Sequence, residues 1–409
     1  MGMGHLRGRP AVLRTSAIAM LLALCCTLGN MTAGASASPP PDGAWRMADS
    51  GTSEPLYAVS CLTASRCFAV GAGGTIRYTA DGGTTWRTQA SPVQGAATVL
   101  YRIACEAPST CYVIARPGTV LVTHDAGATW QAHPLHLAES GPDLTDPACL
   151  SDNEPGLSGR FGFCQLGLLD ISCVSASICS VVATTSTGYN TAAMAQPPRT
   201  GRVPSAIWLT SDGGAHWYRQ ALPSAVACSE GECDPPYNYY PLTWISCLGS
   251  GPCRAGGQLF CGSSCGWAYA VLAAAGPGDP WKLLSCPASS FSCFMFSPDA
   301  GTCPTSELCY GVANSSPSDP GDQVYRSTDG GTQWLGGSSG SSSVRNGIAC
   351  ASALVCYTVG DQGSITATAN GTGYRVQASP VTQDLFGITC VDVRACYAVG
   401  ADGVILTRR

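Results

Sequence analysis

Residues 67–86 read CFAVGAGGTIRYTADGGTTW. The alternation of apolar and small residues on both sides of a glycine turn is typical of two antiparallel strands. Asp81 can accept hydrogen bonds from backbone N–H groups further along the chain, and Gly82 and Gly83 tolerate positive φ, so a second tight turn is expected. Trp86 then opens a third strand and would bury about 150–250 Å². The stretch therefore predicts three consecutive strands and a core tryptophan.

The turn motif recurs along the chain. Near-copies occupy 79–86, 123–130, 210–217 and 327–334, and a shortened copy at 368–374 has Tyr374 in place of the tryptophan. Four copies at matching offsets indicate a structural repeat rather than an isolated hairpin. The motif residues predicted to be structural are Asp81, Trp86, Asp125, Trp130, Asp212, Trp217, Asp329 and Trp334.

Cysteine pairs mark the same repeat. Seven pairs have the spacing C-x5-C: Cys61 with Cys67, Cys105 with Cys111, Cys173 with Cys179, Cys247 with Cys253, Cys303 with Cys309, Cys350 with Cys356, and Cys390 with Cys396. Four pairs with other spacings lie between them: Cys149 with Cys164, Cys228 with Cys233, Cys261 with Cys265, and Cys286 with Cys293. Zinc sites prefer C-x2-4-C spacings and often histidine, and the chain has only 5 histidines. We therefore predict eleven disulfides between sequence neighbours and no metal or cofactor.

A short apolar stretch precedes each first cysteine, so one unit contains four strands. In strand order, the C-x5-C disulfide would link the first strand to the second. Seven such units predict an all-β fold, a single seven-bladed β-propeller of four-stranded antiparallel blades. The last unit stops at Arg409 without its fourth strand, whereas AWRMAD (44–49) resembles TWRTQA (85–90). We expect this N-terminal strand, with Trp45, to complete the last blade and close the ring.

These motifs resemble the Asp-box or BNR repeat of sialidase-like propellers. The longer pattern VGxxGxIxxTxDGGxTW is similar to the propellers of photosystem II assembly and stability factors. The resemblance implies the fold and leaves the activity open, because the box is a structural turn in proteins of many functions. Sialidases carry an Arg-Ile-Pro motif near the first strand. The nearest match here, Tyr101-Arg102-Ile103-Ala104, lacks the proline and aligns with a first strand of the repeat, which argues against a sialidase site.

The N-terminus is typical of an export signal. Arginines precede the apolar run 17–28, and Ala35-Ser36-Ala37 offers a cleavage site after Ala37. Leu24, ahead of Cys25, disfavours a lipoprotein signal. We expect a signal peptide at 1–37, a Pro-rich linker at 38–43 and the propeller at 44–409, secreted, monomeric and without a transmembrane anchor. With a pI near 5.5 and 11% charged residues, nucleic acid is excluded as a partner.

Insertions distinguish the middle blades from the others. They fall after the fourth strand, at about 132–169, 223–243 and 284–302, or between the second and third strands, at about 184–206, 260–267 and 314–322. All six should project from one face, opposite the Asp boxes. Aromatic residues within them could stack on sugars or anchor a protein: Tyr237, Tyr239, Tyr240, Trp244 and Trp267. The alternative is that these rings pack the insertions onto the blades. Calcium is disfavoured at Asp143, Asp146, Asp152 and Glu154, because no D-x-D-x-D-G loop is present.

Two functions fit this sequence. The first is an exported, non-catalytic propeller that binds a protein or a glycan through the face with the insertions. The second is a glycoside hydrolase or lyase on the same scaffold. The first is favoured because no catalytic constellation emerges from the residues, and glycosidases need two facing carboxylates.

Overall fold

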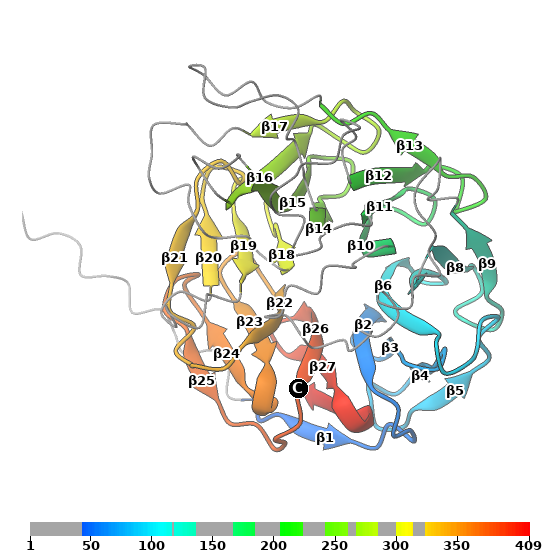
Figure 1. Ribbon diagram of the computed structural model, residues 1–409. Coiled ribbons are helices and arrows are strands. Elements are labelled where there is room, and N and C mark those ends of the chain that lie inside the picture. The colour runs from blue at the N-terminus through cyan, green and yellow to red at the C-terminus, as the bar shows by residue number, and fades with distance from the viewer. Residues whose placement is uncertain are drawn as a thin grey trace, which may run out of the picture. The chain divides into compact units, whose positions relative to one another are not determined.

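The computed structural model describes residues 43–116, 118–135, 167–184, 205–223, 242–260, 267–284, 300–313 and 324–409. They belong to one compact unit, Pro39–Arg409. Seven four-stranded antiparallel sheets follow one another around a ring in Figure 1, and the described part of the chain has no α-helix. This confirms the predicted seven-bladed propeller. The predicted signal peptide lies outside the described residues.

Each blade is named by its order in the chain. Blade 1 contains β2 (Leu56–Thr63), β3 (Arg66–Gly71), β4 (Ile76–Thr79) and β5 (Arg87–Gln89). Blade 2 contains β6 (Val99–Ala107), β7 (Thr110–Arg116), β8 (Thr119–Thr123) and β9 (Gln131–Pro134). Blade 3 contains β10 (Gly167–Cys173), β11 (Cys179–Thr184), β12 (Ser205–Thr210) and β13 (Tyr218–Gln220). Blade 4 contains β14 (Leu242–Cys247), β15 (Cys253–Phe260), β16 (Trp267–Ala274) and β17 (Lys282–Leu284).

The remaining blades follow the same plan. Blade 5 contains β18 (Ala300–Thr302), β19 (Cys309–Val312), β20 (Val324–Ser327) and β21 (Leu335–Gly337). Blade 6 contains β22 (Arg345–Cys350), β23 (Cys356–Gly360), the 3-10 turn η2 (Asp361–Gly363), β24 (Ile365–Thr368) and β25 (Arg375–Gln377). Blade 7 contains β26 (Leu385–Asp392), β27 (Ala395–Gly400), the 3-10 turn η3 (Ala401–Gly403), β28 (Ile405–Arg408) and, from the N-terminus, β1 (Arg46–Ala48).

The N-terminal strand closes the ring. β1 pairs antiparallel with β28, with Arg46 opposite Thr407 and Ala48 opposite Ile405. Trp45, just before β1, is 5% exposed and meets Tyr357 of blade 6 edge to face, with ring centroids 6.1 Å apart. The first strands contact one another in chain order, and β26 contacts β2. The ring therefore has no open edge between blades 7 and 1.

Disulfides clip the first two strands of every blade. The bonded pairs are Cys61 with Cys67, Cys105 with Cys111, Cys173 with Cys179, Cys247 with Cys253, Cys303 with Cys309, Cys350 with Cys356, and Cys390 with Cys396. Their Cα atoms lie 3.9–4.1 Å apart. Most pairs are register partners, as Cys105 and Cys111 are. The structure thus contains the seven predicted clips.

The four predicted disulfides with other spacings stay predictions. They lie outside the described residues: Cys149 with Cys164, Cys228 with Cys233, Cys261 with Cys265, and Cys286 with Cys293.

Aromatic contacts join neighbouring blades. The ring just before a fourth strand meets, edge to face, the aromatic residue that follows the second clip cysteine of the preceding blade; these pairs are Trp86–Tyr397, Trp130–Phe68, Trp217–Tyr112 and Trp45–Tyr357. The hydroxyls of Tyr112 and Tyr397 donate to backbone carbonyls of the next blade, at Ala176 (2.7 Å) and Ala64 (2.5 Å). The Asp-box tryptophan thus seals an interface between blades.

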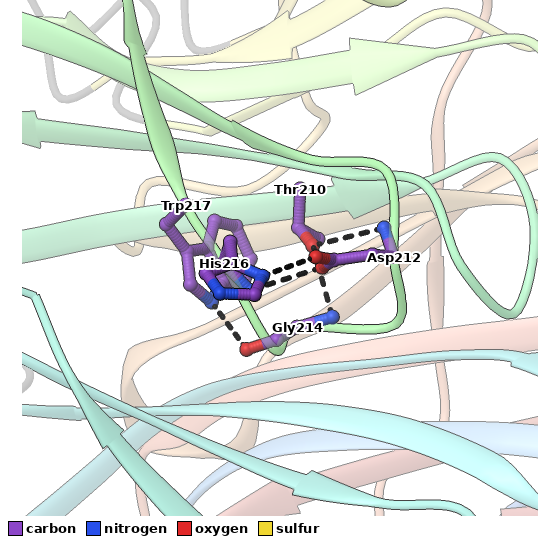
Figure 2. A network of polar contacts seen from close by, with 5 residues as sticks. All are labelled: Thr210, Asp212, Gly214, His216 and Trp217. Carbon is purple, nitrogen blue, oxygen red and sulfur yellow. Dashed lines mark hydrogen bonds and ion pairs between the residues drawn. The ribbon is translucent and has the colours of Figure 1, made fainter.

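The Asp box is a compact hydrogen-bonded turn. In Figure 2 the Asp212 carboxylate accepts from the His216 backbone N–H (3.0 Å) and contacts His216 Nδ1 (2.6 Å). The Thr210 hydroxyl donates to Asp212 (3.0 Å) and accepts from the Gly214 N–H (2.9 Å). Trp217 Nε1–H donates to the Gly214 carbonyl (3.1 Å). These bonds close the turn that the sequence predicts.

The two faces of the ring carry different turns. On the Asp-box face, each described box turn lies beside the first hairpin turn of its blade, as the Gly82 N–H bond to the Ser65 carbonyl (2.9 Å) shows. We call the opposite face the looped face. There, the turns between second and third strands meet the connections that enter the first strands; in blade 1, the Ala72 N–H donates a hydrogen bond to the Pro55 carbonyl (2.9 Å). The gaps 136–166, 185–204, 224–241, 261–266, 285–299 and 314–323 all join strand ends on the looped face.

Candidate ligand-binding site

Six first strands share one irregularity near the looped face. In the pairing of each with its second strand, the residue four positions before the first clip cysteine is skipped. Bulges of this kind re-aim side chains and are common beside binding sites. We call these residues the bulge ring: Tyr57, Tyr101, Leu169, Thr243, Asn346 and Phe386. The part of the looped face around the bulge ring is called the mouth.

An ion pair links blades 2 and 3 at the mouth. Arg102 Nε lies 3.6 Å from an Asp170 carboxylate oxygen, and both side chains are largely buried. The other Asp170 oxygen accepts from the Ile245 backbone N–H of blade 4 (2.9 Å). Burial raises the pKa of Asp170 to about 6, although Arg102 and this hydrogen bond oppose the increase. Asp170 is therefore a carboxylate that loses its charge in mildly acidic solution, as pH falls through about 6.

A second arginine stands beside this pair without a carboxylate. The guanidinium carbons of Arg116 and Arg102 lie 4.0 and 4.2 Å from the centroid of the Tyr101 ring. Arg116 Nε is buried and has no hydrogen-bond partner among the described residues. Burial lowers the pKa of Arg116 below its ordinary value; Tyr101 opposes this decrease, and repulsion from Arg102 adds to it. The charge of Arg102 lowers the pKa of Tyr101. We call Tyr101, Arg102 and Arg116 the cationic cluster.

Beside Arg116, blade 2 differs from the compact blades 1, 6 and 7, as do blades 3 and 5, which have Ala183 and Ala313. Four positions after the second clip cysteine, blades 1, 6 and 7 have glycine: Gly71, Gly360 and Gly400. A Cβ at any of these glycines would collide with a backbone carbonyl of the connection entering the first strand. Blade 2 has Ala115 at this position, and its first two strands continue one pair further, with Val99 opposite Arg116. Strand pairing therefore holds the Arg116 backbone at the mouth.

The blade itself does not require an arginine at this place. At the position equivalent to Arg116, blades 1 and 7 have Ala72 and Ala401, and blade 6 has Asp361. The repeat therefore folds with a small side chain here. A buried arginine whose Nε is unpaired, at a position where alanine suffices, favours a binding role over a structural one.

Aromatic and acidic residues continue the mouth on the other side of blade 1. Tyr57 packs on Phe386 of blade 7, with ring centroids 5.6 Å apart, and Tyr57 also interacts electrostatically with Arg116. Asp361 of blade 6 accepts from Asn346 Nδ2 (2.9 Å). Asp384 of blade 7 accepts from the Gln362 backbone N–H (2.8 Å). Burial, followed by the negative charge of Asp384, raises the pKa of Asp361.

Most of the aromatic residues predicted to bind a ligand lie outside the residues that the structure describes. Tyr237, Tyr239 and Tyr240 lie outside it, and so does the side chain of Trp267 at the start of β16. Their role stays a prediction. The prediction that Trp244 binds a ligand is wrong, because only 1% of this residue is exposed.

Glycines create the space that buries Trp244. A Cβ at Gly256 would collide with its ring, and one at Gly301 of the next blade would lie 2.7 Å from it. The ring also meets Trp334 edge to face, with centroids 6.2 Å apart. Trp244 therefore packs between blades 4 and 5 and is not available to a ligand.

The other predicted residues lie away from the mouth. Asp81, Asp125, Asp212 and Asp329 all accept hydrogen bonds within their own turns on the Asp-box face. Sequence reasoning overlooked Trp281, which is 5% exposed, fills the tryptophan position of blade 4 and donates to Gln220 of blade 3 (2.8 Å). Its turn, GPGDP (276–280), lacks the box pattern, so only its place before β17 marks it.

No group of three or more His, Cys, Asp or Glu side chains in the described residues could hold a metal ion. Across the same residues, no helix is long and apolar enough to cross a membrane.

Comparison with known proteins agrees with the fold. Residues 39–145 match the family model described as photosynthesis system II assembly factor YCF48. No curated protein matches the sequence. The solved structure described as "YCF48 bound to D1 peptide" is 15% identical, with 89% of this chain and 96% of that chain covered and a TM-score of 0.56.

Two further structures share the architecture. YCF48 from Cyanidioschyzon merolae is 16% identical, with 90% of this chain and 98% of that chain covered and a TM-score of 0.57. A streptogramin B lyase is 10% identical, with 89% and 97% covered and a TM-score of 0.53. Identities this low establish the fold only. The chain is a seven-bladed β-propeller, four of whose blades carry full Asp-box turns, and its residues 39–145 are similar to the YCF48 photosystem II assembly factors.

Proposed function

We propose that this chain is an exported, non-catalytic propeller that binds a protein ligand at the mouth of the looped face. The observation that carries the proposal is Arg116. Its guanidinium is buried on Tyr101, its Nε has no partner among the described residues, and Arg102 repels it. A buried guanidinium N–H without an acceptor is costly for folding, so its presence is best explained by a ligand that supplies the acceptor.

The cationic cluster favours a protein ligand with an exposed carboxylate. Arginine binds carboxylates in a planar, bidentate geometry, and arginine and tyrosine are enriched among residues that dominate binding energies. The similar structure of YCF48 with a bound D1 peptide supports a peptide as the ligand of such a propeller. The predicted insertions, which join the looped face, would extend the contact surface.

Export rests on two observations. The N-terminal sequence has the arginines, apolar run and small residues of a cleavable signal. Seven disulfides in one chain are typical of proteins that fold in an oxidising compartment. N-terminal sequencing of the exported protein tests this part directly, with cleavage expected after Ala37.

The enzymatic alternative has one supporting observation. Asp361 and Asp384 are close enough for repulsion to raise the pKa of Asp361. Glycosidases use paired carboxylates, but Asn346 and the Gln362 N–H already bond these two. We therefore favour binding over hydrolysis.

A capture experiment tests the proposal. The mature protein, its Arg116→Gln variant and a control, Arg87→Gln on the exposed outer strand β5, are immobilised and incubated with the exported proteins of the source cells. Mass spectrometry should find a protein retained by wild type and Arg87→Gln and depleted at least about tenfold by Arg116→Gln, the effect expected for a charged hydrogen bond. Equal capture by all three contradicts the site. Glycan binding on an array without protein capture favours the glycan alternative.

A further inference from the structure

The mouth has opposite charges at its two ends. Blades 6, 7, 1 and 2 are consecutive, because β22 contacts β26, β26 contacts β2, and β2 contacts β6. Asp361 and Asp384, which we call the acidic pair, belong to blades 6 and 7, and the cationic cluster belongs to blade 2. Phe386 and Tyr57 lie between them and pack on each other. The mouth thus presents acid, aromatic and cation in order along one arc.

One position of the repeat supplies charge to both ends of this arc. Asp361 of blade 6 and Arg116 of blade 2 each lie five residues after the second clip cysteine of their blade. Blades 7 and 1, which stand between them, have Ala401 and Ala72 at the same position. The sign of the charge therefore changes from one end to the other, although the repeat position is the same.

Hydrogen bonds hold the acidic pair in place, but nearby cations neutralise its negative charge only in part. Asn346 Nδ2 bonds both Asp361 and the Leu385 carbonyl (3.0 Å), which ties blade 6 to blade 7. The cation that acts on Asp361 is Arg345, whose guanidinium bonds Ser341 and Ser364. Among the described residues, neither carboxylate forms a salt bridge.

At the other end of the arc, the cationic cluster has a positive charge that no carboxylate balances. Arg102 is paired with Asp170, so the charge of Arg116 is the one left without a carboxylate. Its buried Nε lacks an acceptor within the described residues. An anion alone would satisfy Arg116 and leave the acidic pair uncompensated. A ligand with both charges would satisfy the two ends together.

We propose that this arc binds a dipolar peptide segment, with a carboxylate on Arg116, a lysine or arginine on Asp384 and Asp361, and an apolar residue against Phe386, which packs on the buried Tyr57 ring. This rests on the proposed protein-binding function and specifies its ligand. The two charges fix the direction in which the segment lies across the mouth. Complementary charges at both ends supply specificity, since a segment bound in reverse would meet like charges.

Selection from a random dodecapeptide display library tests the proposal without a known partner. The wild-type protein should enrich peptides that carry an acidic and a basic residue at a fixed separation. Arg116→Gln should abolish enrichment of the acidic residue only, and Asp384→Asn that of the basic residue only. Asp402→Asn, an exposed acid in the neighbouring turn η3, serves as the matched control and should select the wild-type motif.

Selected peptides then give the quantitative result. A peptide with both charges should bind at least about tenfold tighter than its Glu→Gln and its Lys→Gln versions, the effect expected for each charged hydrogen bond. Enrichment of acidic peptides lost in Arg116→Gln but unaffected by Asp384→Asn would overturn the dipolar ligand and leave the protein-binding function standing. Enrichment indifferent to Arg116→Gln, or no enrichment, would overturn both.

Discussion

The Asp-box face and the mouth use the same blades in opposite ways. On the Asp-box face, blades 1 and 2 repeat one set of contacts: the hydroxyls of Thr79 and Thr123 donate to Asp81 and Asp125 at 2.8 Å in both cases. At the mouth, the bulge positions change from tyrosine in blades 1 and 2 to asparagine in blade 6, and blade 2 places an arginine where blades 1 and 7 have alanine. Repetition here marks what the fold requires, and departure from it marks where a ligand is expected.

The largest expected effect concerns ring closure. Trp45→Ala removes a buried ring between blades 6 and 7 and should lower the free energy of unfolding by about 3–5 kcal/mol. Urea denaturation measures this. Met47→Ala, two residues further along and 64% exposed, is the matched control and should change stability by less than about 0.5 kcal/mol. Equal losses in the two variants would mean that Trp45 does not seal the ring.

The next effect concerns the box hydroxyl. Thr79 is buried, and its Oγ1 accepts from the Gly83 N–H at 2.8 Å. Thr79→Val leaves that N–H unsatisfied and should cost about 1–3 kcal/mol of stability. Ligand affinity in the folded fraction should stay at the wild-type value. Thr79→Ser keeps the hydroxyl and should recover most of the loss; a weakened affinity in either folded variant would move the binding site to the Asp-box face.

Acid should destabilise the protein through the boxes. The Thr85 and Thr129 hydroxyls, then their backbone N–H groups, lower the pKa of Asp81 and Asp125 to about 2, and the His216 N–H and ring do the same for Asp212. Because these pKa values are below those of the unfolded chain, the stability is present above about pH 4 and is lost as pH falls towards 2. Denaturation midpoints between pH 5 and 2 measure it.

The control for this titration replaces all three aspartates by asparagine, which should flatten the acid slope. A slope unchanged in that variant would assign acid sensitivity to other groups. Asp170 titrates with the opposite sign, because burial raises its pKa to about 6. Its contribution is therefore fully present below about pH 4 and is lost as pH rises through 6. The mouth and the boxes are thus distinguished by pH window as well as by place.

The smallest effect concerns one non-glycine turn residue. Ala126 has φ 57° at a box position where the other full boxes have glycine, as at Gly82 (φ 71°). A left-handed backbone costs a residue with a Cβ about 1–2 kcal/mol, and glycine relieves this cost. Part of the relief is lost because glycine has more conformational freedom in the unfolded chain. Ala126→Gly should therefore raise stability by roughly 0.5 kcal/mol by thermal denaturation. A loss of stability would show that this turn differs from the other boxes.

Periodic features of the fold were predictable from the sequence, and the site was not. Box, clip and strand patterns recur, so the blade number, the seven clips and the closing role of Trp45 followed from counting. Arg116 and Asp170 come from different blades, and only the ring brings them to the same mouth. Aligning the second strands would have shown that an arginine replaces alanine there. The prediction that Trp244 binds a ligand was wrong. The burial of its ring depends on Gly256 and Gly301, and Gly301 meets it only when blades 4 and 5 are assembled.

The affinity and stability of Arg116→Gln, measured together, test the central claim most directly. Removing a cation whose buried Nε has no acceptor should leave the urea midpoint unchanged or higher, while affinity for the captured protein falls about tenfold or more. That opposition is expected only of a residue kept for binding. A variant that loses stability and keeps wild-type affinity would show that Arg116 serves the fold, and would contradict a binding site at the mouth.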